Sequence, residues 1–595
     1  MKAGGEMNLT IGAGQDSVLG EGPPTRSYFH MPAPRKYTPS GFQKFRLDAL
    51  GQPTLQLENS STFSFQVPRY ADLLSDAMVC VTLPNVWSPI MPPDGRPLGE
   101  KGAQGADGQG TQGVSADAIG EGVLGNGDCW APYEFKWIEH IGAKMIAKIA
   151  IVCGNLTLQE YSGDYLLAAV QRDFSDEMRA KFDEMTGHVP EVMDPANANG
   201  RVNMYPNAYW KRDYDGFARG PEPSVRGRTL YVPINAWFTL CSEAAFPLCS
   251  LQNNELFINV TFRPVNELFV VRDVFDAHNQ FPYIAPRFTK WYMQLHRFLQ
   301  PPPNRALEIG DYSDTRVLWN ANVHLMCTYV FLAEPERAAF IALPQRYAFK
   351  QVREQTITNV SGPNRVDLKS LGLVASWLFY FQRSDAGLRN EWSNYTNWPY
   401  AGQVPLNAVE ADSEGDHAVV HTVDGEEETT LIGPGVNPDG SPTGFVLAPL
   451  FSAVNARDIL VAMGISLDGN YRENVLPAGV YDLMEKYTRT TGHAPRGLLC
   501  YAFGMHSGQL SGLQPSGQIN MNSYQRIELE FTTITPPINP FAQSMVVCDP
   551  GTGNIVGINK PSWSIYEYTY DLHIFEERVN FIVFSAGNCA LQLAT

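Results

Sequence analysis

Apolar and polar residues alternate along much of the chain, and this pattern predicts β-strands with one buried face. In residues 62–67 the side chains of Phe63 and Phe65 fall on the same side. The same period of two runs through residues 255–262, 526–531 and 566–574. In 526–531 the apolar residues alternate with charged ones, which we expect on the solvent face. An all-β protein is therefore expected.

Two segments depart from this alternation and predict helices. Residues 163–187 carry apolar side chains spaced three and four apart, which is typical of an amphipathic helix. Ser162 or Asp164 is available as its N-cap, and Gly187 as its stop. A shorter helix is predicted over residues 334–343.

Long stretches with neither period separate the predicted strands. Residues 90–128, 188–228 and 400–445 are rich in loop-forming residues, and loops of this length are usually functional or flexible. Many strands joined by a few long loops favour sandwiches that carry decorations at one end. Residues 1–45 are predicted to form an extended arm, and the composition of residues 300–304, QPPPN, indicates a linker.

The composition agrees with a turn-rich β protein. The 595 residues include 51 glycines and 43 prolines, with 11% aromatic and only 18% charged residues. Acidic residues outnumber basic ones by 62 to 44, which gives a formal net charge of −18. Such a surface repels phosphate backbones, so no direct contact with nucleic acid is expected.

The cysteines and the N-terminus both indicate a reducing compartment. The nine cysteines form no C-x-x-C pair, and their odd number argues against a complete disulfide framework. The first ten residues, MKAGGEMNLT, contain no apolar signal core, and no apolar run reaches the length of a spanning helix. We expect a protein that stays in the cytoplasm or nucleus, or that leaves by a route other than secretion.

Motifs for ligand or metal binding are weak. Gly108, Gly110 and Gly113 fit G-x-G-x-x-G, but a dinucleotide site needs a strand before and a helix after, and here both flanks are loop. His417 and His421 have i, i+4 spacing in an acidic segment without helical period, so a solvated loop is favoured over a zinc site.

Catalytic motifs are equally scarce. The chain has no G-x-S-x-G elbow, and Ser516 in QPSGQ lacks the first glycine. Paired carboxylates for glycoside chemistry stay open, because sequence gives no distances. The sequence therefore predicts no catalytic, cofactor-binding or metal-ligating residue, and a protein that is not an enzyme. In residues 512–523, GLQPSGQINMNS, a turn is predicted at Pro515 and Gly517. Asn520, Asn522 and Ser523 are then expected to hydrogen-bond the local backbone.

PRYADLLSDAMVCVTLP, at residues 68–84, and LQPSGQINMNS, at residues 513–523, are two of seven segments with a common resemblance. In their order along the chain, the seven resemble the major capsid protein family of the nucleocytoplasmic large DNA viruses. Among them, PRYADLLSDAMVCVTLP is similar to its R-x-G-D-L-I strand, and LQPSGQINMNS to its Q-P-S-G-x-x-N-F-S motif. The segments are residues 68–84, 142–166, 230–262, 329–352, 389–396, 513–523 and 580–595. The chain departs from the family pattern at Ala71, where a glycine is usual, at Asn253 and Asn254, and in the long loops.

The resemblance implies two tandem eight-stranded jelly-roll β-sandwiches with short helices and long loop insertions. It divides the chain into the arm at 1–45, a first jelly roll at 46–333, a helical connection at 334–344 and a second jelly roll at 345–595. The proline run at 300–304 then lies in a loop of the first jelly roll instead of forming the linker.

The family's function, carried over, is structural. It implies a homotrimer with a pseudo-hexagonal outline that tiles the icosahedral shell of a large double-stranded DNA virus. The implied partners are neighbouring capsomers, minor and penton capsid proteins and an internal membrane layer, and no cofactor is implied. The protein is expected in the virion, after assembly in the host cytoplasm.

Three other functions compete with this interpretation. A poxvirus-type scaffold, also a double jelly roll, shapes a membrane and is later shed. A minor or penton capsid protein usually has a single jelly roll. A carbohydrate-active or carbohydrate-binding β-sandwich should show a cleft with close carboxylates or clustered aromatic residues.

Overall fold

A computed structural model gives the fold of residues 38–592. Residues 1–37 and 593–595 lie outside this description, together with the whole of the predicted loop at 90–128. β1 begins at Ser40, within the segment 1–45 that the sequence predicts as an arm. Within 38–592 the description leaves out residues 52–53, 89–133, 203, 207, 209–210, 213–217, 220, 274–281, 291–292, 303–311, 313, 316–318, 403–416, 424–425, 433–455, 509–513, 538–544, 549–554 and 560–565.

The first half of the chain forms a sandwich of two antiparallel sheets, each with four main strands. The strand order is β1-β16-β4-β10 in one sheet and β3-β12-β6-β7 in the other. The first strand pairs with the last, which closes the roll. The strands are β1 (Ser40–Asp48), β16 (His324–Leu332), β4 (Leu73–Leu83), β10 (Arg228–Pro233), β3 (Ser61–Val67), β12 (Leu256–Phe262), β6 (Ile146–Cys153) and β7 (Leu156–Tyr161), and β11 (Phe246–Pro247) also pairs with β4.

The second half repeats this order with its own strands. One sheet runs β17-β29-β19-β24 and the other β18-β26-β22-β23, so the fold is a double jelly roll. The strands are β17 (Gln345–Val360), β29 (Tyr570–Ser585), β19 (Leu373–Arg383), β24 (Leu498–Ala502), β18 (Pro363–Asp367), β26 (Ile527–Thr533), β22 (Leu460–Leu467) and β23 (Asn470–Pro477), with β25 (Ile519–Asn520) beside β19 and β30 (Asn588–Gln592) beside β29.

Short elements complete the described chain. The small sheets comprise β14 (Tyr283–Ile284), β13 (Phe269–Arg272) and β5 (Phe135–Trp137); β15 (Trp319–Asn320) with β2 (Thr54–Leu55); β8 (Lys211–Arg212) with β9 (Ala218–Arg219); β20 (His417–Val423) with β21 (Glu426–Ile432); and β27 (Met545–Cys548) with β28 (Ile555–Asn559). The α-helices are α3 (Ile141–Lys144), α4 (Gly163–Asp173), α5 (Asp176–Thr186), α6 (Pro190–Met193), α7 (Glu334–Ala342) and α8 (Glu485–Arg489). Single 3-10 turns occur at Trp237–Thr239, Ser242–Ala244, Leu248–Ser250, Val265–Glu267, Leu295–Arg297, Ala386–Leu388 and Met521–Ser523, and a π-turn at Val480–Met484. None of the helices in the described ranges is both long and apolar enough to cross a membrane.

The predicted strand alternation is confirmed in β3 and β12, whose alternate residues are buried. In β26 it is only half right, because Glu528 is 1% exposed where the pattern places it on the solvent face. The reason is a pair of cations: Arg365 and Arg526 both form ion pairs with this carboxylate. Charge pairing thus allows a carboxylate to be covered on a strand that otherwise alternates.

The predicted helix over 163–187 is wrong as a single element, because it is two helices. Ser162 caps α4 as expected, accepting a hydrogen bond from the backbone N–H of Tyr165, and Gly187 ends α5 at a φ of 83°. Between them Phe174 is extended, and Ser175 caps α5 by accepting from the N–H of Met178. A second N-cap serine inside the apolar period is the signal that separates the helices. The helix predicted over 334–343 is confirmed as α7.

The predicted loop at 400–445 contains a hairpin. β20 pairs with β21 from His417 opposite Ile432 to Val423 opposite Glu426. Asp424 and Gly425 stand between these strands in the sequence, and an Asp-Gly pair is a hairpin signal. The expectation of irregular backbone across this stretch is therefore wrong for the two strands.

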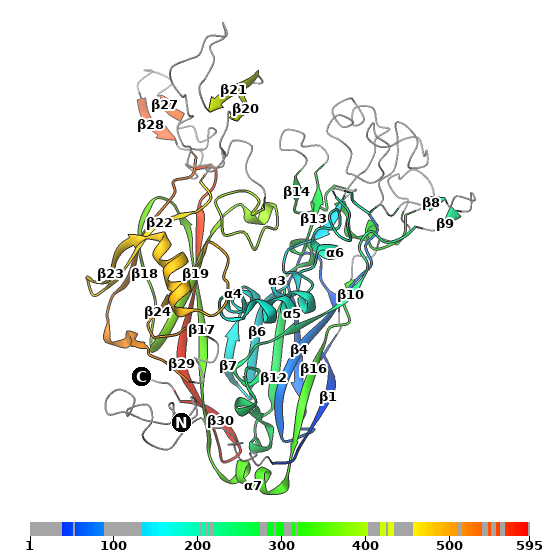
Figure 1. The fold of residues 1–595 in the computed structure, drawn as a ribbon, viewed down its shortest axis with the longest axis vertical. Helices are drawn as coiled ribbons and strands as arrows, with labels where there is room; N and C mark the ends of the chain where they lie inside the picture. The colour runs from blue at the N-terminus through cyan, green and yellow to red at the C-terminus, as the bar shows by residue number, and fades with distance from the viewer. Residues whose placement is uncertain are drawn as a thin grey trace, which may run out of the picture.

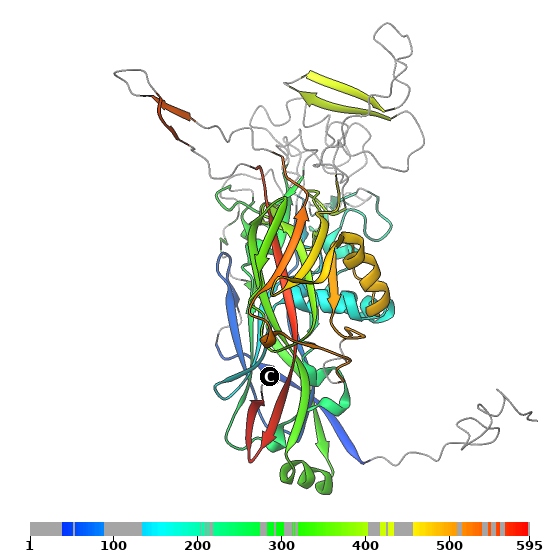
Figure 2. The ribbon, with the colours of Figure 1, turned by 90° about the vertical axis from the view of Figure 1, so that its left-hand side faces the viewer.

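The two sandwiches stand side by side, with α7 joining them at one end (Figure 1). The hairpins β20–β21 and β27–β28 lie at the opposite end, as both views show (Figures 1 and 2). Ser40, the first residue of β1, pairs with Leu332 at the end of β16, two residues before α7 begins. The chain therefore enters the first sandwich at the α7 end.

The sheet β17-β29-β19-β24 is covered on both faces. Trp377, Phe379 and Phe381 of β19 belong to the core of the second sandwich, whereas the alternate residues Leu378 and Tyr380 pack into the core of the first. In β29 the residues Tyr570, Leu572 and Ile574 face the second core, and Phe575, Ile582 and Phe584 face the first. This sheet is thus the wall that the two cores share.

Gly163, the first residue of α4, makes a testable close contact. A Cβ at this position would overlap the carbonyl oxygens of Ala143 and Ile146, because α4 packs tightly on the end of α3. Gly163→Ala should therefore lower the free energy of unfolding by about 1–3 kcal/mol, although alanine ordinarily favours a helix. Urea denaturation followed by circular dichroism measures this change. Gly479→Ala is the matched control, since its Cβ would meet no atom within 4 Å; equal stability of both variants would contradict the packing argument.

Candidate functional site between the two sandwiches

The motifs that the sequence offers for chemistry do not come together in the described structure. Gly108, Gly110 and Gly113 lie outside the described residues. His417 and His421 lie on β20, and the description does not extend to their side chains. In the part of the chain that is described, no group of three His, Cys, Asp or Glu side chains is placed to hold a metal ion.

The segment 512–523 has a local structural role where it is described. The hydroxyl of Ser516 donates to the carbonyl oxygen of His506 at 3.1 Å and accepts from the N–H of the same residue at 3.0 Å. Asn520 caps the turn at Met521–Ser523 by accepting from the N–H of Asn522 at 3.0 Å, which confirms the predicted local bond. The side chain of Asn522 differs from the prediction, because it reaches the N–H of Gly372 at 2.9 Å.

Helix α4 carries the polar residues that join the sandwiches, and the second sandwich binds both of its ends. At its start the N–H of Ser162 donates to the carboxylate of Glu354 on β17 at 2.7 Å. At its end the N–H of Gly492 donates to the carbonyl oxygen of Arg172 at 2.7 Å. The hydroxyl of Thr491 donates to the backbone carbonyl oxygen of Asp173 at 2.5 Å. Backbone N–H and carbonyl groups at helix ends usually bond to water, but at both ends of α4 they bond to residues of the second sandwich.

The last turn of α4 places a buried arginine against β29. Arg172 is 0% exposed and donates to both oxygens of Asp173, at 2.6 and 2.8 Å. Nη2, which also donates to Asp173, and Nη1 donate to the two oxygens of Glu577, at 2.8 and 3.1 Å. Glu577 is also fully buried. One guanidinium therefore forms two-pronged contacts with a carboxylate from each sandwich, the strongest geometry available to arginine.

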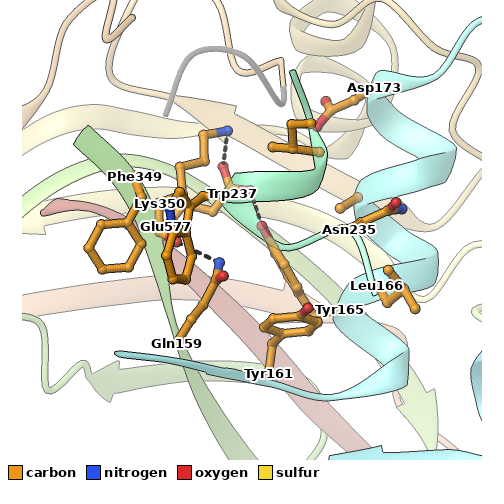
Figure 3. A pocket seen from close by; sticks show the side chains of 12 residues that line it. Gln159, Tyr161, Tyr165, Leu166, Asp173, Asn235, Trp237, Phe349, Lys350 and Glu577 are labelled. Carbon is orange, nitrogen blue, oxygen red and sulfur yellow. Dashed lines mark hydrogen bonds and ion pairs between the residues drawn. The ribbon is translucent and has the colours of Figure 1, made fainter. Parts of the chain in front are cut away.

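Glu577 gathers further donors from three elements. Lys350 of β17 donates to it at 3.0 Å and Tyr165 of α4 at 2.8 Å, and both point toward its carboxylate (Figure 3). The hydroxyl of Ser376 on β19 also donates to it. The ammonium of Lys350 also donates hydrogen bonds to the carbonyl oxygens of residues 507 and 508, at 2.8 and 3.0 Å. We call Arg172, Asp173, Lys350 and Glu577 the buried ion cluster; its two positive and two negative charges balance.

The pKa values in the cluster follow from burial and pairing. Burial alone would raise the pKa of Glu577, but the adjacent charges of Arg172 and Lys350 hold it well below its ordinary value. Burial lowers the pKa of Lys350, partly opposed by the charge of Glu577. Burial raises the pKa of Asp173, partly opposed by the charge of Arg172.

A second polar contact lies at the start of α4. Asp164 accepts from the fully buried ammonium of Lys144 at 2.7 Å and from the guanidinium of Arg263 at 2.6 Å. Lys144 also donates to the carbonyl oxygen of Trp392, at 2.9 Å. The guanidinium of Arg263 stacks over the Trp392 ring at 4.9 Å. Lys144 and Arg263 of the first sandwich thus both contact Trp392, in a loop of the second sandwich.

That loop lies within the segment 389–396, RNEWSNYT. The amide of Asn390 donates to the carbonyl oxygens of Asn266 and Phe269, at 2.8 and 2.9 Å. The indole N–H of Trp392 donates to the carbonyl oxygen of Glu267 at 3.0 Å. The loop is therefore hydrogen-bonded to the backbone of the first sandwich at three points, which gives a physical role to a segment that the sequence marks only by resemblance.

Together these contacts fix how one sandwich sits on the other. A small pocket remains between α4 and β17, lined by polar and aromatic side chains including Gln159, whose amide donates to the carbonyl oxygen of Lys350 at 2.9 Å (Figure 3). Buried charge pairs add little net stability over apolar packing, but each demands its partner in place. The geometry therefore builds a rigid joint.

The sequence did not predict this junction. Charged residues inside apolar runs, as in the segment 570–585 around Glu577, were the available signal. A charge in the middle of a strand that is otherwise apolar needs a buried partner. Sequence alone gives no position for that partner, which comes from α4, about 400 residues earlier in the chain.

Removing one charge of the buried ion cluster should be costly. Glu577→Gln should lower the free energy of unfolding by about 3–5 kcal/mol, because Arg172 and Lys350 stay buried with one carboxylate fewer. The midpoint of guanidinium denaturation measures this. Asp458→Asn is the matched control: it breaks the exposed pair with Arg496 and should cost less than about 1 kcal/mol. Similar losses in the two variants would refute a special role for the cluster.

The second contact predicts acid sensitivity. Burial raises the pKa of Asp164, but Lys144 and Arg263 outweigh this and lower it from 3.8 to about 2. Its folded pKa lies below its unfolded pKa, so its stabilisation is complete above about pH 4 and is lost as the pH falls toward 2. Asp164→Asn should remove about 2 kcal/mol of this pH dependence, measured by denaturation at stepped pH. Asp367→Asn, at a side chain that is 70% exposed, should keep the wild-type profile; an unchanged profile in Asp164→Asn would contradict the assignment.

Comparison with known proteins gives the same picture as the fold. The family described as "Major capsid protein N-terminus" matches residues 121–295. The chain is 24% identical over 267 residues to the major capsid protein of Chrysochromulina ericina virus, covering 44% of this chain and 41% of that protein. It is 21% identical over 442 residues to the major capsid protein of Phaeocystis pouchetii virus, covering 66% and 75%. The match thus spans less than half of the first relative and about three quarters of the second.

A shorter match and a solved structure complete the comparison. A scaffold protein of fowlpox virus is 26% identical over 144 residues, which is 24% of this chain and 21% of that protein. The PBCV-1 virus capsid structure superposes with a TM-score of 0.54, covering 96% of this chain and 100% of the other at 15% identity. At that identity the structural likeness concerns the fold alone. The chain is thus similar in sequence to viral major capsid proteins, and its double jelly-roll fold resembles that of the PBCV-1 capsid structure.

Proposed function

We propose that this chain is a structural major capsid protein of a large DNA virus and that three copies form a pseudo-hexagonal capsomer. The observation that carries the proposal is the rigid joint between two sandwiches of identical strand order. Two similar lobes in each subunit give six lobes around a threefold axis. Cyclic closure makes the trimer a finished unit, and its outline allows side-by-side paving of a flat face.

The proposal includes a division of the chain into domains. The boundary expected at 46 moves to Ser40, where β1 begins. Residues 40–333 and 345–595 would then be the two jelly rolls, and residues 334–344 the connection between them. Because the shared wall is covered on both faces, the two rolls act as one block in the capsomer. A tile that must transmit force between neighbours benefits from such a block, since a flexible connection would let the lobes rotate.

The two ends of the subunit suggest its orientation in a shell. The chain enters at the α7 end, so we place the arm, 1–45, and its contacts with minor capsid proteins or an internal membrane layer there. The hairpin end then faces outward. Penton proteins and neighbouring capsomers would contact the sides. The net charge of −18 supports a role without direct contact to nucleic acid. The expected location is the virion, after assembly in the host cytoplasm.

A scaffold function is the second candidate, and the match to the fowlpox virus scaffold protein favours it over the remaining alternatives. The two functions differ in their fate during maturation. A capsid protein stays among the most abundant proteins of purified mature virions, whereas a shed scaffold is absent from them. Quantitative protein analysis of mature particles therefore separates the candidates.

The trimer is the direct test of the proposed capsomer. Purified protein should give a mass of about 200 kDa by light scattering, three times the 66.0 kDa of one chain. Electron micrographs of the same sample should show six-lobed particles. A monodisperse monomer would overturn the proposal, and cleavage of a glycan by that monomer would support the carbohydrate-active alternative.

A further inference from the structure

Two cysteines from different sandwiches meet in the shared core. Cys153 is the last residue of β6 and is 1% exposed; Cys589 lies in β30 and is 7% exposed. Both side chains belong to the same apolar core, each thiol is the largest influence on the pKa of the other, and neither forms a disulfide in this structure. They lie where β6 of the first sandwich meets the β29–β30 hairpin of the second.

The backbone on both sides holds this pair in place. The turn between β29 and β30 docks on the first sandwich, where the carbonyl oxygen of Gly587 accepts from the N–H groups of Gln252 and Asn253 at 2.9 and 3.2 Å. The residue after Cys153 is fixed by the same loop, because the N–H of Gly154 donates to the carbonyl oxygen of Glu255 at 2.8 Å. One loop, residues 252–255, thus binds the neighbours of both cysteines.

The two thiols are chemically unequal. Arg69 donates to the carbonyl oxygens of Gln252 and Asn254, at 3.3 and 2.8 Å, which keeps its positive charge near Cys153. The adjacent Cys589 side chain and the charge of Arg69 lower the pKa of Cys153 against the effect of burial, and the adjacent Cys153 side chain, together with burial, raises the pKa of Cys589. Because the thiolate is the reactive form and Arg69 acts on Cys153, we assign Cys153 as the nucleophile of the pair.

We propose that Cys153 and Cys589 form an intramolecular disulfide between the two sandwiches when the protein meets a peroxide. The thiolate of Cys153 attacks one peroxide oxygen and the O–O bond breaks; the leaving hydroxide takes a proton and becomes water. Cys153 is then a sulfenic acid. The sulfur of Cys589, losing its proton, attacks the sulfur of Cys153 and expels a second water. Two thiols lose two electrons in total, and one peroxide is reduced to two waters.

The bond would suit a protein that changes compartment. Thiols stay reduced in cytosol and disulfides persist outside it, so the pair would remain open during assembly and close after release. A bond between residues 153 and 589 links distant parts of the chain and restricts the unfolded state strongly. It would also prevent the two sandwiches from separating at the wall that they share.

Peroxide treatment of the purified full-length protein tests the proposal. The intact mass should fall by two hydrogen atoms, and non-reducing peptide mapping should yield one cross-linked peptide containing Cys153 and Cys589. The melting temperature should rise by on the order of 5 °C and return when a reductant is added. The cross-link is expected within one chain, so the mass in denaturing gels should stay that of a monomer.

Variants separate this pair from general oxidation. Cys589→Ser should lose the cross-link and the rise in melting temperature, whereas Cys500→Ser, at another buried free cysteine, should keep both. The mapping of the wild-type protein needs no variant, so a folding defect in Cys589→Ser leaves the test intact. The proposal would be overturned if Cys153 and Cys589 could both still be alkylated after peroxide treatment. A sulfinic acid at Cys153 without a cross-link, or a disulfide to a different cysteine, would also overturn it. Trimer formation is measured separately and does not depend on the outcome.

Discussion

The carboxylate of Glu577 is the constraint on which the arrangement of the two sandwiches depends. It lies on β29, in the wall between two cores, where an ionised group without partners would be several kcal/mol unfavourable. Arg172, Lys350 and Tyr165 satisfy it only if α4 and β17 occupy one position relative to β29. Apolar contacts around the cluster provide the larger attraction, but attraction between apolar surfaces has little direction. The polar groups supply the direction.

The fold was largely predictable from the sequence because strands leave a local pattern. β3 and β12 are buried at alternate residues, and each pattern is complete within seven residues. The order of seven segments along the chain then predicted the double jelly roll, because it resembles the order in a known family. The errors have local causes as well. A single serine, Ser175, divides the predicted helix into α4 and α5, and an Asp-Gly pair after Val423 turns an expected loop into a hairpin.

The junction was not predictable because its partners are far apart in sequence. Nothing near Arg172 indicates Glu577, and nothing near Lys144 indicates the carbonyl oxygen of Trp392. Such pairs exist only once the sheets have folded and packed. The segment 389–396 was recognised by resemblance, yet its hydrogen bonds to residues 266–269 follow from geometry that no single sequence contains. Period two also cannot reveal a strand that is buried on both faces, as β19 shows.

The shared wall has a consequence for how the chain is made. Phe575, Ile582 and Phe584, which help to fill the first core, belong to β29 and leave the ribosome almost last. The first jelly roll therefore cannot reach its final packing while the ribosome is still translating the second, even though all of its own strands have emerged. Nascent chains must wait with part of an apolar surface uncovered, at the stage when aggregation is most damaging. Completion of the polypeptide, rather than completion of a domain, is the event that closes the first core.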